Sequence, residues 1–159
     1  MARQYAPAGV SCIINGGREV GEWLAHDERI ALVSATGSTR MGKAVGAAVG
    51  ERLGRSLLEL GGNNAIIITP KADLDIAMHA SLFGAVGTAG QRCTSTRRLI
   101  IHDSVYDNFT QKLVKAYGQV RIGDPLDEHN HMGPLIDHVA VEQYNKALDA
   151  VRKQGGKVL

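Results

Sequence analysis

The sequence is poor in aromatic residues and in cysteine, and each shortage argues against a class of function. Aromatic residues make up 4% of the 159 residues, which argues against a platform for stacking nucleic-acid bases. The 18 lysines and arginines nearly balance 16 aspartates and glutamates, so no electrostatic footprint for nucleic acid is expected. Two cysteines cannot build a disulfide framework, and we therefore expect a reducing, cytoplasmic location.

Long hydrophobic runs are also missing. No apolar stretch approaches the length that crosses a bilayer, and residues 1–7 contain no apolar signal core, so no membrane partner is expected. The composition that is present, 44% hydrophobic and 21% charged, is sufficient for a packed core.

Short aliphatic runs alternate with stretches of helical periodicity along the chain. This alternation predicts an α/β fold with largely parallel sheets and covering helices. Both ends look cut, because residues 158–159 resemble the start of a further strand, and we expect an interior piece of a longer chain. The predicted strands are 10–14, 30–33, 56–60, 65–68 and 98–102, and the predicted helices are 19–24, 40–53, 74–86, 105–117 and 139–153.

The segment TGSTRMG (36–42) follows a predicted strand and opens a predicted helix. A helix N-terminus offers free backbone N–H groups and a positive dipole end to a phosphate, and glycine lets the backbone approach a ligand. The spacing differs from the usual dinucleotide fingerprint, so an ordinary strand-to-helix turn explains it about as well. The candidate coenzyme residues here are Thr36, Gly37, Ser38 and Gly42.

Glu59 lies at the carboxyl end of an apolar strand, where open α/β sheets bind ligands. The carboxylate stands between two leucines and precedes the paired Gly61 and Gly62. This context is unusual for simple packing and makes Glu59 a candidate functional residue. A strand-end glutamate turned to solvent is the alternative.

Cys93 lies in the polar sequence GQRCTS (90–95), which is a poor place for a packing cysteine. Arg92 and backbone N–H groups could supply the positive potential that a thiolate nucleophile needs. Cys12 is the contrast: it lies within the predicted strand 10–14 among apolar neighbours, and we predict that it is buried. A structural role for Cys93 is the alternative. His129 and His131 lack further ligands at metal-binding spacing, so no metal site is expected.

These motifs, in this order and at these separations, resemble the aldehyde dehydrogenase superfamily. The matching elements are GSTRMG (37–42), ELGGN (59–63), GQRC (90–93) and GPLI (133–136). The resemblance covers essentially the whole chain. NNAII (63–67) and TAGQRCT (88–94) are further similar to the antiquitin-like branch, which oxidises α-aminoadipic semialdehyde in lysine breakdown.

The resemblance implies the second half of a Rossmann-like coenzyme domain in residues 1–60 and the first part of an α/β catalytic domain in residues 61–159. It implies NAD as cofactor, an aldehyde as substrate and a homo-oligomer. Cys93 would form a thioester, Glu59 would activate the hydrolytic water, and Arg92 would hold the substrate carboxylate. The implied coenzyme-binding residues are Thr36, Gly37, Ser38, Gly42, Leu60 and Gly61.

Two functions of different kinds therefore stay open. The chain belongs either to an active oxidoreductase or to a catalytically silent piece that folds or oligomerises without turnover. Family members are longer, and nothing here matches their oxyanion asparagine or their adenine-ribose lysine. A cysteine acyltransferase is a weaker third possibility. The coenzyme turn before Glu59 argues against it, because acyl transfer needs no nicotinamide.

Overall fold

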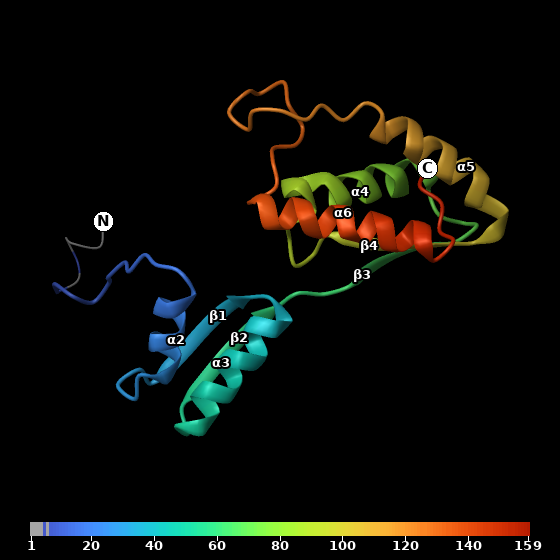
Figure 1. The fold of residues 1–159 in the computed structure, drawn as a ribbon. Coiled ribbons are helices and arrows are strands. Elements are labelled where there is room, and N and C mark those ends of the chain that lie inside the picture. Colours follow the sequence, from blue (N-terminus) through green and yellow to red (C-terminus); the bar gives the residue numbers. More distant parts are fainter. Residues whose placement is uncertain (1–4, 6) are drawn as a thin grey trace. The chain divides into compact units, whose positions relative to one another are not determined.

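The chain folds into two compact units, Met1–Gly61 and Gly62–Leu159, each of which is described by itself (Figure 1). The structure is a computed structural model that describes residue 5 and residues 7–159. The division falls in the Gly61-Gly62 connection that follows Glu59. Helices and parallel strands alternate in both units, which confirms the α/β fold predicted from the sequence.

Unit 1 contains two parallel strands joined by a helix. α3 packs along both strands, and α2 packs against α3. Among the described residues of this unit, Ala25 and Val49 are the buried apolar side chains. The elements are α2 (Arg18–His26), β1 (Leu32–Gly37), α3 (Thr39–Glu51) and β2 (Arg55–Leu60).

The close approach of α3 to β2 depends on a small residue. Gly42 is buried in α3, and a Cβ at this position would overlap both terminal methyl groups of Leu60. Gly46 lies one turn further along, where a Cβ would be in ordinary contact with Leu58 at 3.5 Å. A helix that presents glycine at these positions can lie directly on the strand behind Glu59.

Unit 2 repeats the parallel strand pair with a different set of helices. α4 packs on β3, β4 and α5, and the buried apolar side chains are Ile68 and Phe109. The Asp73 carboxylate caps α4 by accepting from the N–H groups of Asp75 and Ile76. The elements are β3 (Asn64–Ile68), α4 (Leu74–Val86), the 3₁₀ turn η1 (Gly87–Gly90), β4 (Thr96–Ile101), α5 (Asp103–Tyr117) and α6 (His138–Lys153).

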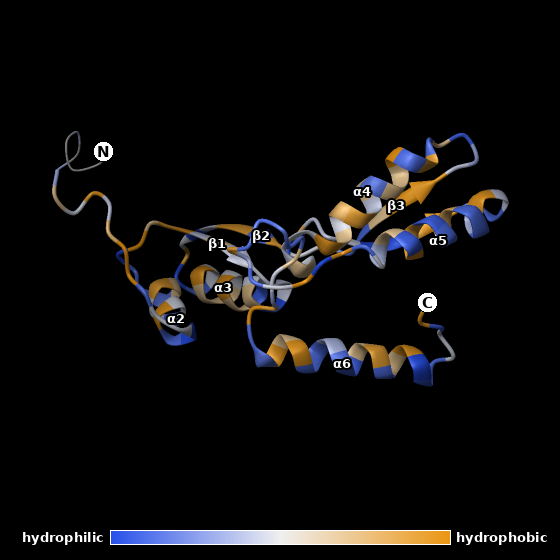
Figure 2. Cartoon of the chain, turned by 90° about the horizontal axis from the view of Figure 1, so that it is seen from above, coloured by the Kyte–Doolittle hydropathy of each residue, from blue (hydrophilic) through white to orange (hydrophobic). Residues whose placement is uncertain are grey.

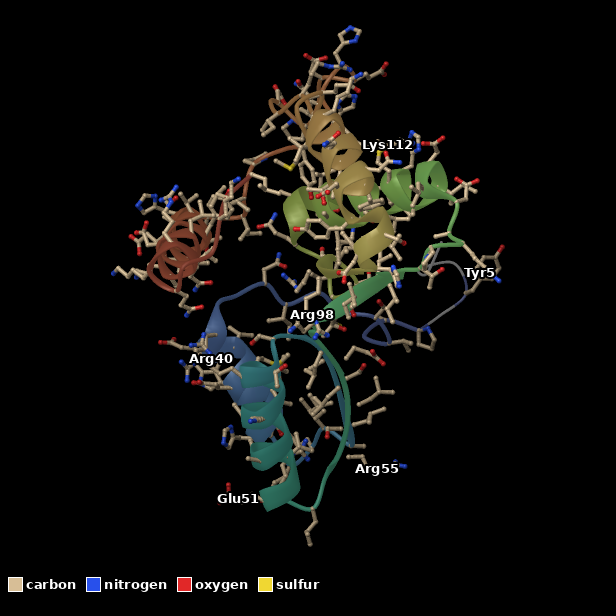
Figure 3. All side chains as sticks on the ribbon, turned by 90° about the vertical axis from the view of Figure 1, so that its right-hand side faces the viewer. Tyr5, Arg40, Glu51, Arg55, Arg98 and Lys112 are labelled. Atoms are coloured by element: carbon tan, nitrogen blue, oxygen red, sulfur yellow. The ribbon has the colours of Figure 1, made fainter. Side chains whose placement is uncertain are left out.

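An ion pair joins α4 to α5 on the surface of unit 2. Lys112 Nζ lies 2.7 Å from Asp75 Oδ1, and Lys112 is labelled on α5 in Figure 3. The hydrogen bond and charge of Lys112 hold the pKa of Asp75 below its ordinary value. Any stability from this pair is therefore present above the ordinary carboxyl pKa and is lost as the pH falls through the lowered one. Both side chains are exposed, so the contribution is small.

The strand predicted at 10–14 is absent, and Cys12 is exposed instead of buried. Ile13 and Ile14 of the same segment are also exposed. An aliphatic run becomes a strand only where a neighbouring strand satisfies its backbone, and within the described residues β1 and β2 pair only with each other. The strand start predicted at 158–159 is likewise absent.

Each strand pair has one bare face. In β3 and β4, Ile67 pairs with Ile100, and their side chains are 69% and 52% exposed. After Asn64, β3 consists of hydrophobic residues, and Figure 2 shows its arrow in the hydrophobic colour. In unit 1, Leu32 and Leu57 are similarly exposed. None of the helices in the described part of the chain combines the length and apolarity that crossing a bilayer requires.

The glycine contact in unit 1 can be tested with a matched pair of substitutions. Gly42→Ala should lower the free energy of unfolding by about 1–3 kcal/mol, because the added methyl group overlaps Leu60. Gly50→Ala, in the same helix with open space around it, should raise it by up to about 1 kcal/mol through helix propensity. Urea unfolding followed by the fluorescence of Trp23, the single tryptophan, measures both. Equal stabilisation by the two changes would contradict the packing argument.

Candidate active site

The predicted coenzyme turn and the predicted base meet at one edge of unit 1. β1 and β2 are parallel and in register, so Thr36 lies beside Glu59 and Gly37 lies beside Leu60. Both strands end at this edge, and the Glu59 side chain is exposed there. The structure therefore brings together the residues that the sequence placed 23 positions apart (59 minus 36).

The N-terminus of α3 opens directly from this edge. Ser38 is the N-cap, and its hydroxyl oxygen accepts from the Met41 N–H at 3.1 Å. The first turn contains no acidic residue and includes Arg40. The N–H groups of Thr39 and Arg40 have no acceptor within the helix, so they and the helix dipole suit a phosphate group. Gly42 is explained structurally by its contact with Leu60, and a coenzyme contact for it is a prediction.

Cys93 lies in a tight turn between η1 and β4, and its side chain is exposed. The turn is fastened by one side chain from β3. Asn64 Nδ2 donates to the Cys93 carbonyl at 2.7 Å and to the Ser95 carbonyl at 3.1 Å. An amide with two donors thus satisfies two carbonyls of the turn and ties it to the first residue of β3.

Ser95 closes the same turn from the inside. It is buried, its hydroxyl accepts from the Arg92 N–H at 3.1 Å, and its own N–H donates to the Arg92 carbonyl at 3.2 Å. The backbone on both sides of Cys93 is therefore fixed while the thiol stays accessible. Sequence reasoning assigned no role to Asn64 or Ser95, because nothing in either local sequence identifies a partner that lies 31 residues away.

Two arginines of β4 hold the segment that leads into β3. Arg97 Nε donates to the Gly62 carbonyl at 3.2 Å, and Arg98 Nη2 donates to the Asn63 carbonyl at 2.7 Å. Arg98 is labelled in Figure 3, where it lies at the start of β3. Gly62 and Asn63 belong to the motif that follows Glu59, so the cysteine-bearing region and this motif are directly bonded within unit 2.

The Gly-Pro motif also reaches the cysteine segment. The side-chain oxygen of Gln91 accepts from the Ile136 N–H at 2.9 Å, across 45 residues of sequence. Gln91 Nε2 in turn donates to the Thr88 carbonyl at 3.2 Å. A motif that looked isolated in the sequence is therefore held beside the residue two positions before Cys93.

Glu59 belongs to unit 1 and Cys93 to unit 2, so their action on one substrate stays a prediction from the motifs.

The two histidines at 129 and 131 have structural partners: Arg121 donates from Nε to the His129 carbonyl at 2.5 Å and from its backbone N–H to His131 Nδ1 at 3.1 Å. Within the described residues, no three histidine, cysteine or acidic side chains gather as metal ligands.

These features define a class of α/β protein. A carboxylate and a helix N-terminus lie at the carboxyl ends of two parallel strands, and an exposed thiol lies in a turn held by hydrogen bonds. The model of the aldehyde dehydrogenase family matches residues 1–159, and the chain belongs to that family. The resemblance stated from the motifs is thereby confirmed.

Curated relatives include the antiquitin-like branch. Aldehyde dehydrogenase family 7 member A1 of Brassica napus is 46% identical over 159 residues, which are 100% of this chain and 32% of that protein. Alpha-aminoadipic semialdehyde dehydrogenase of Bos taurus is 48% identical over 153 residues, 96% of this chain and 28% of that protein. The chain thus spans about a third of the length of the curated relatives it matches.

Solved structures of the family share the fold. An NADP dependent enzyme of E. coli superimposes with a TM-score of 0.93 at 35% identity, covering 99% of this chain and 33% of that one. Betaine aldehyde dehydrogenase of Staphylococcus aureus, solved in complex with NAD+, gives a TM-score of 0.85 at 30% identity, covering 90% of this chain and 28% of that one.

The Asn64 brace generates a local prediction. Asn64→Ala removes the donor of two carbonyls and should destabilise the cysteine turn by about 1–3 kcal/mol. Asn63→Ala is the matched control, since the Arg98 bond uses only its backbone carbonyl and an exposed substitution of this kind costs within about 0.5 kcal/mol. Deuterium uptake of residues 91–96 measures the effect. Uptake that is the same in both variants would show that Asn64 does not hold the turn.

Proposed function

We propose that this chain carries the nucleophile and the general base of an NAD-dependent aldehyde dehydrogenase. The reaction is oxidation of an aldehyde, α-aminoadipic semialdehyde in lysine breakdown, to the carboxylic acid. The observation that carries the proposal is the exposed Cys93 thiol in a turn whose backbone is fixed by Asn64 and Ser95. A nucleophile needs this combination of accessible side chain and fixed backbone.

The chemical steps assigned to the chain follow from its residues. The Cys93 thiolate attacks the aldehyde carbon and forms a thiohemiacetal, whose oxyanion the Cys93 backbone N–H helps to hold. NAD, when bound, supplies the acceptor for the hydride that leaves this carbon. The thioester that results is cleaved by a water from which Glu59 takes a proton, which releases the carboxylic acid and the thiol.

The coenzyme assignment is supported by the edge of unit 1. Ser38 and the first N–H groups of α3 would hold the pyrophosphate, because the first turn has no opposing acid. Thr36 and the backbone of Leu60 and Gly61 would line the nicotinamide pocket. The family includes the NAD+ complex of the Staphylococcus aureus relative and the NADP dependent E. coli enzyme, and we propose NAD as in the antiquitin-like branch.

The substrate assignment is supported by Arg92 and by the names of the relatives. Alpha-aminoadipic semialdehyde dehydrogenase of Bos taurus is similar over 96% of this chain. The substrate in that name carries a carboxylate, and Arg92 places a guanidinium next in sequence to the nucleophile. A guanidinium fork matches a carboxylate in geometry and charge.

The second candidate is a silent unit that folds and associates without turnover in the cytoplasm. The observation that favours it is the pair of two-stranded sheets with bare apolar faces, such as that of Ile67 and Ile100. Unpaired strand edges and bare faces favour association, and a homo-oligomer is proposed under either function. The measurement of turnover separates the two functions.

Replacement of the nucleophile tests the chemistry. NADH formation from NAD and α-aminoadipic semialdehyde, followed by absorbance, should be abolished by Cys93→Ala. Cys12→Ala is the matched control, because Cys12 is the other exposed thiol and should be dispensable. Turnover that survives Cys93→Ala would refute the assignment. An inactive but folded wild-type chain would favour the silent candidate.

Replacement of the base tests the second half of the reaction. Glu59→Gln should permit one rapid round of NADH formation and then stall, because the thioester accumulates without a base for water; steady turnover should fall about 10²–10⁴-fold. Intact-protein mass spectrometry should detect the acyl adduct on Cys93, and added hydroxylamine should release it. A loss of the first round equal to the loss of steady turnover would instead assign Glu59 to thiol activation.

A further inference from the structure

The Arg92 side chain is held from three sides. Its Nε–H donates to the Thr88 hydroxyl at 2.9 Å, and its guanidinium carbon lies 5.3 Å from the centroid of the Phe83 ring. Gly87 leaves the space that the guanidinium occupies, since a Cβ there would lie 2.9 Å from Nη1 and 3.0 Å from the guanidinium carbon. These contacts restrain a long side chain that would otherwise sample many rotamers.

The backbone of Arg92 is fixed as well. Its N–H and its carbonyl both bond to the buried Ser95, and Arg97 Nη2 donates to the same carbonyl at 3.4 Å. Main chain and side chain are thus restrained together, although the residue itself is exposed. Restraint of an exposed arginine at both ends is a property of a preorganised binding group.

The residue that supplies the hydroxyl sits in an unusual backbone conformation. Thr88 has φ +53° and Ala89 has φ +53°, followed by Gly90 at φ +70°. The left-handed region is disfavoured for a β-branched residue, and such strain persists where the surrounding structure holds it. In this conformation the Thr88 hydroxyl reaches Arg92 four residues later.

The end of the guanidinium is left open. Nε is the side-chain nitrogen that bonds to protein, and within the described residues Nη1 and Nη2 donate to no acceptor. Over the same part of the chain, Arg92 forms no ion pair with aspartate or glutamate. The two terminal nitrogens can therefore bind both oxygens of one carboxylate from the end.

We infer that Phe83, Gly87 and Thr88 are positioning residues that set Arg92 as a preformed carboxylate fork beside Cys93. The inference rests on the proposed function in one respect: the anion is the second, anionic group of the aldehyde substrate. Together these residues select aldehydes that carry a carboxylate over neutral aldehydes of the same length. They act through Arg92 and leave the chemistry of Cys93 unchanged.

Alkylation of Cys93 tests the positioning without coenzyme or turnover. Iodoacetate carries a carboxylate and iodoacetamide does not. The iodoacetate preference of a thiol, defined as its alkylation rate with iodoacetate divided by its rate with iodoacetamide, therefore measures how well Arg92 binds a carboxylate next to Cys93. Cys12, also exposed, is the internal reference, and peptide mass spectrometry follows both thiols. The iodoacetate preference at Cys93 should exceed that at Cys12, and Arg92→Gln should remove the excess.

Two pairs of variants separate positioning from bulk structure. Thr88→Val and Phe83→Leu should each lower the iodoacetate preference about two- to tenfold, the worth of one hydrogen bond or one exposed cation–π contact. Thr88→Ser and Phe83→Tyr keep the hydroxyl and the ring, and they should retain it. A preference unchanged in Thr88→Val and Phe83→Leu, with circular dichroism showing both folded, would overturn the inference, as would equal preferences at Cys93 and Cys12 in the wild type.

Kinetics then connect the fork with the substrate. Thr88→Val should raise KM for α-aminoadipic semialdehyde about three- to tenfold, while KM for hexanal, a neutral aldehyde of equal length, should not change. Equal changes for both aldehydes would overturn the inference. If the alkylation rates follow the expected pattern but the chain forms no NADH, the proposed function is refuted and the positioning of Arg92 still holds.

Discussion

Two hydrogen bonds from the Asn64 amide hold the turn on which the proposed chemistry depends. Asn64 Nδ2 bonds to the carbonyls of Cys93 and Ser95, and Ser95 in turn fixes the backbone of Arg92. A turn that must expose a thiol cannot be stabilised by burying it, so its backbone groups need partners from elsewhere. The same bonds tie the turn to the first residue of β3, whereas β3 and β4 are paired by their own backbone register.

In unit 1, the backbone around the exposed Glu59 is held by close packing at a glycine. Because Gly42 has no side chain, α3 lies directly against Leu60, and the helix begins at the edge where Glu59 and Thr36 are neighbours. An alanine there would separate the helix from the strand and move the phosphate-suited N–H groups away from that edge. Close packing in this unit and hydrogen bonding in unit 2 are therefore two ways of holding an exposed site on a fixed backbone.

Local patterns predicted most elements because helix caps and strand ends are encoded in short segments. The helix predicted at 74–86 is α4, and the segment after Gly37 opens α3 as predicted. The failures concern partners: the run around Cys12 has the composition of a strand but no strand beside it. Asn64 and Thr88 were missed for the same reason, since their roles arise from bonds to distant residues and from a left-handed backbone that no local pattern specifies.

The physical demands of substrate selection explain why the restraint of Arg92 matters. A flexible arginine beside a nucleophile attracts any anion, whereas one whose Nε is already bonded to Thr88 presents only its terminal nitrogens in a defined direction. In the proposed reaction, the direction of the Arg92 terminal nitrogens matters because the aldehyde carbon must reach Cys93 while the substrate carboxylate is bound to Arg92. In the proposed site, the left-handed backbone at Thr88 and Ala89 has a consequence beyond ending α4, because it places the hydroxyl that directs the Arg92 charge toward a carboxylate.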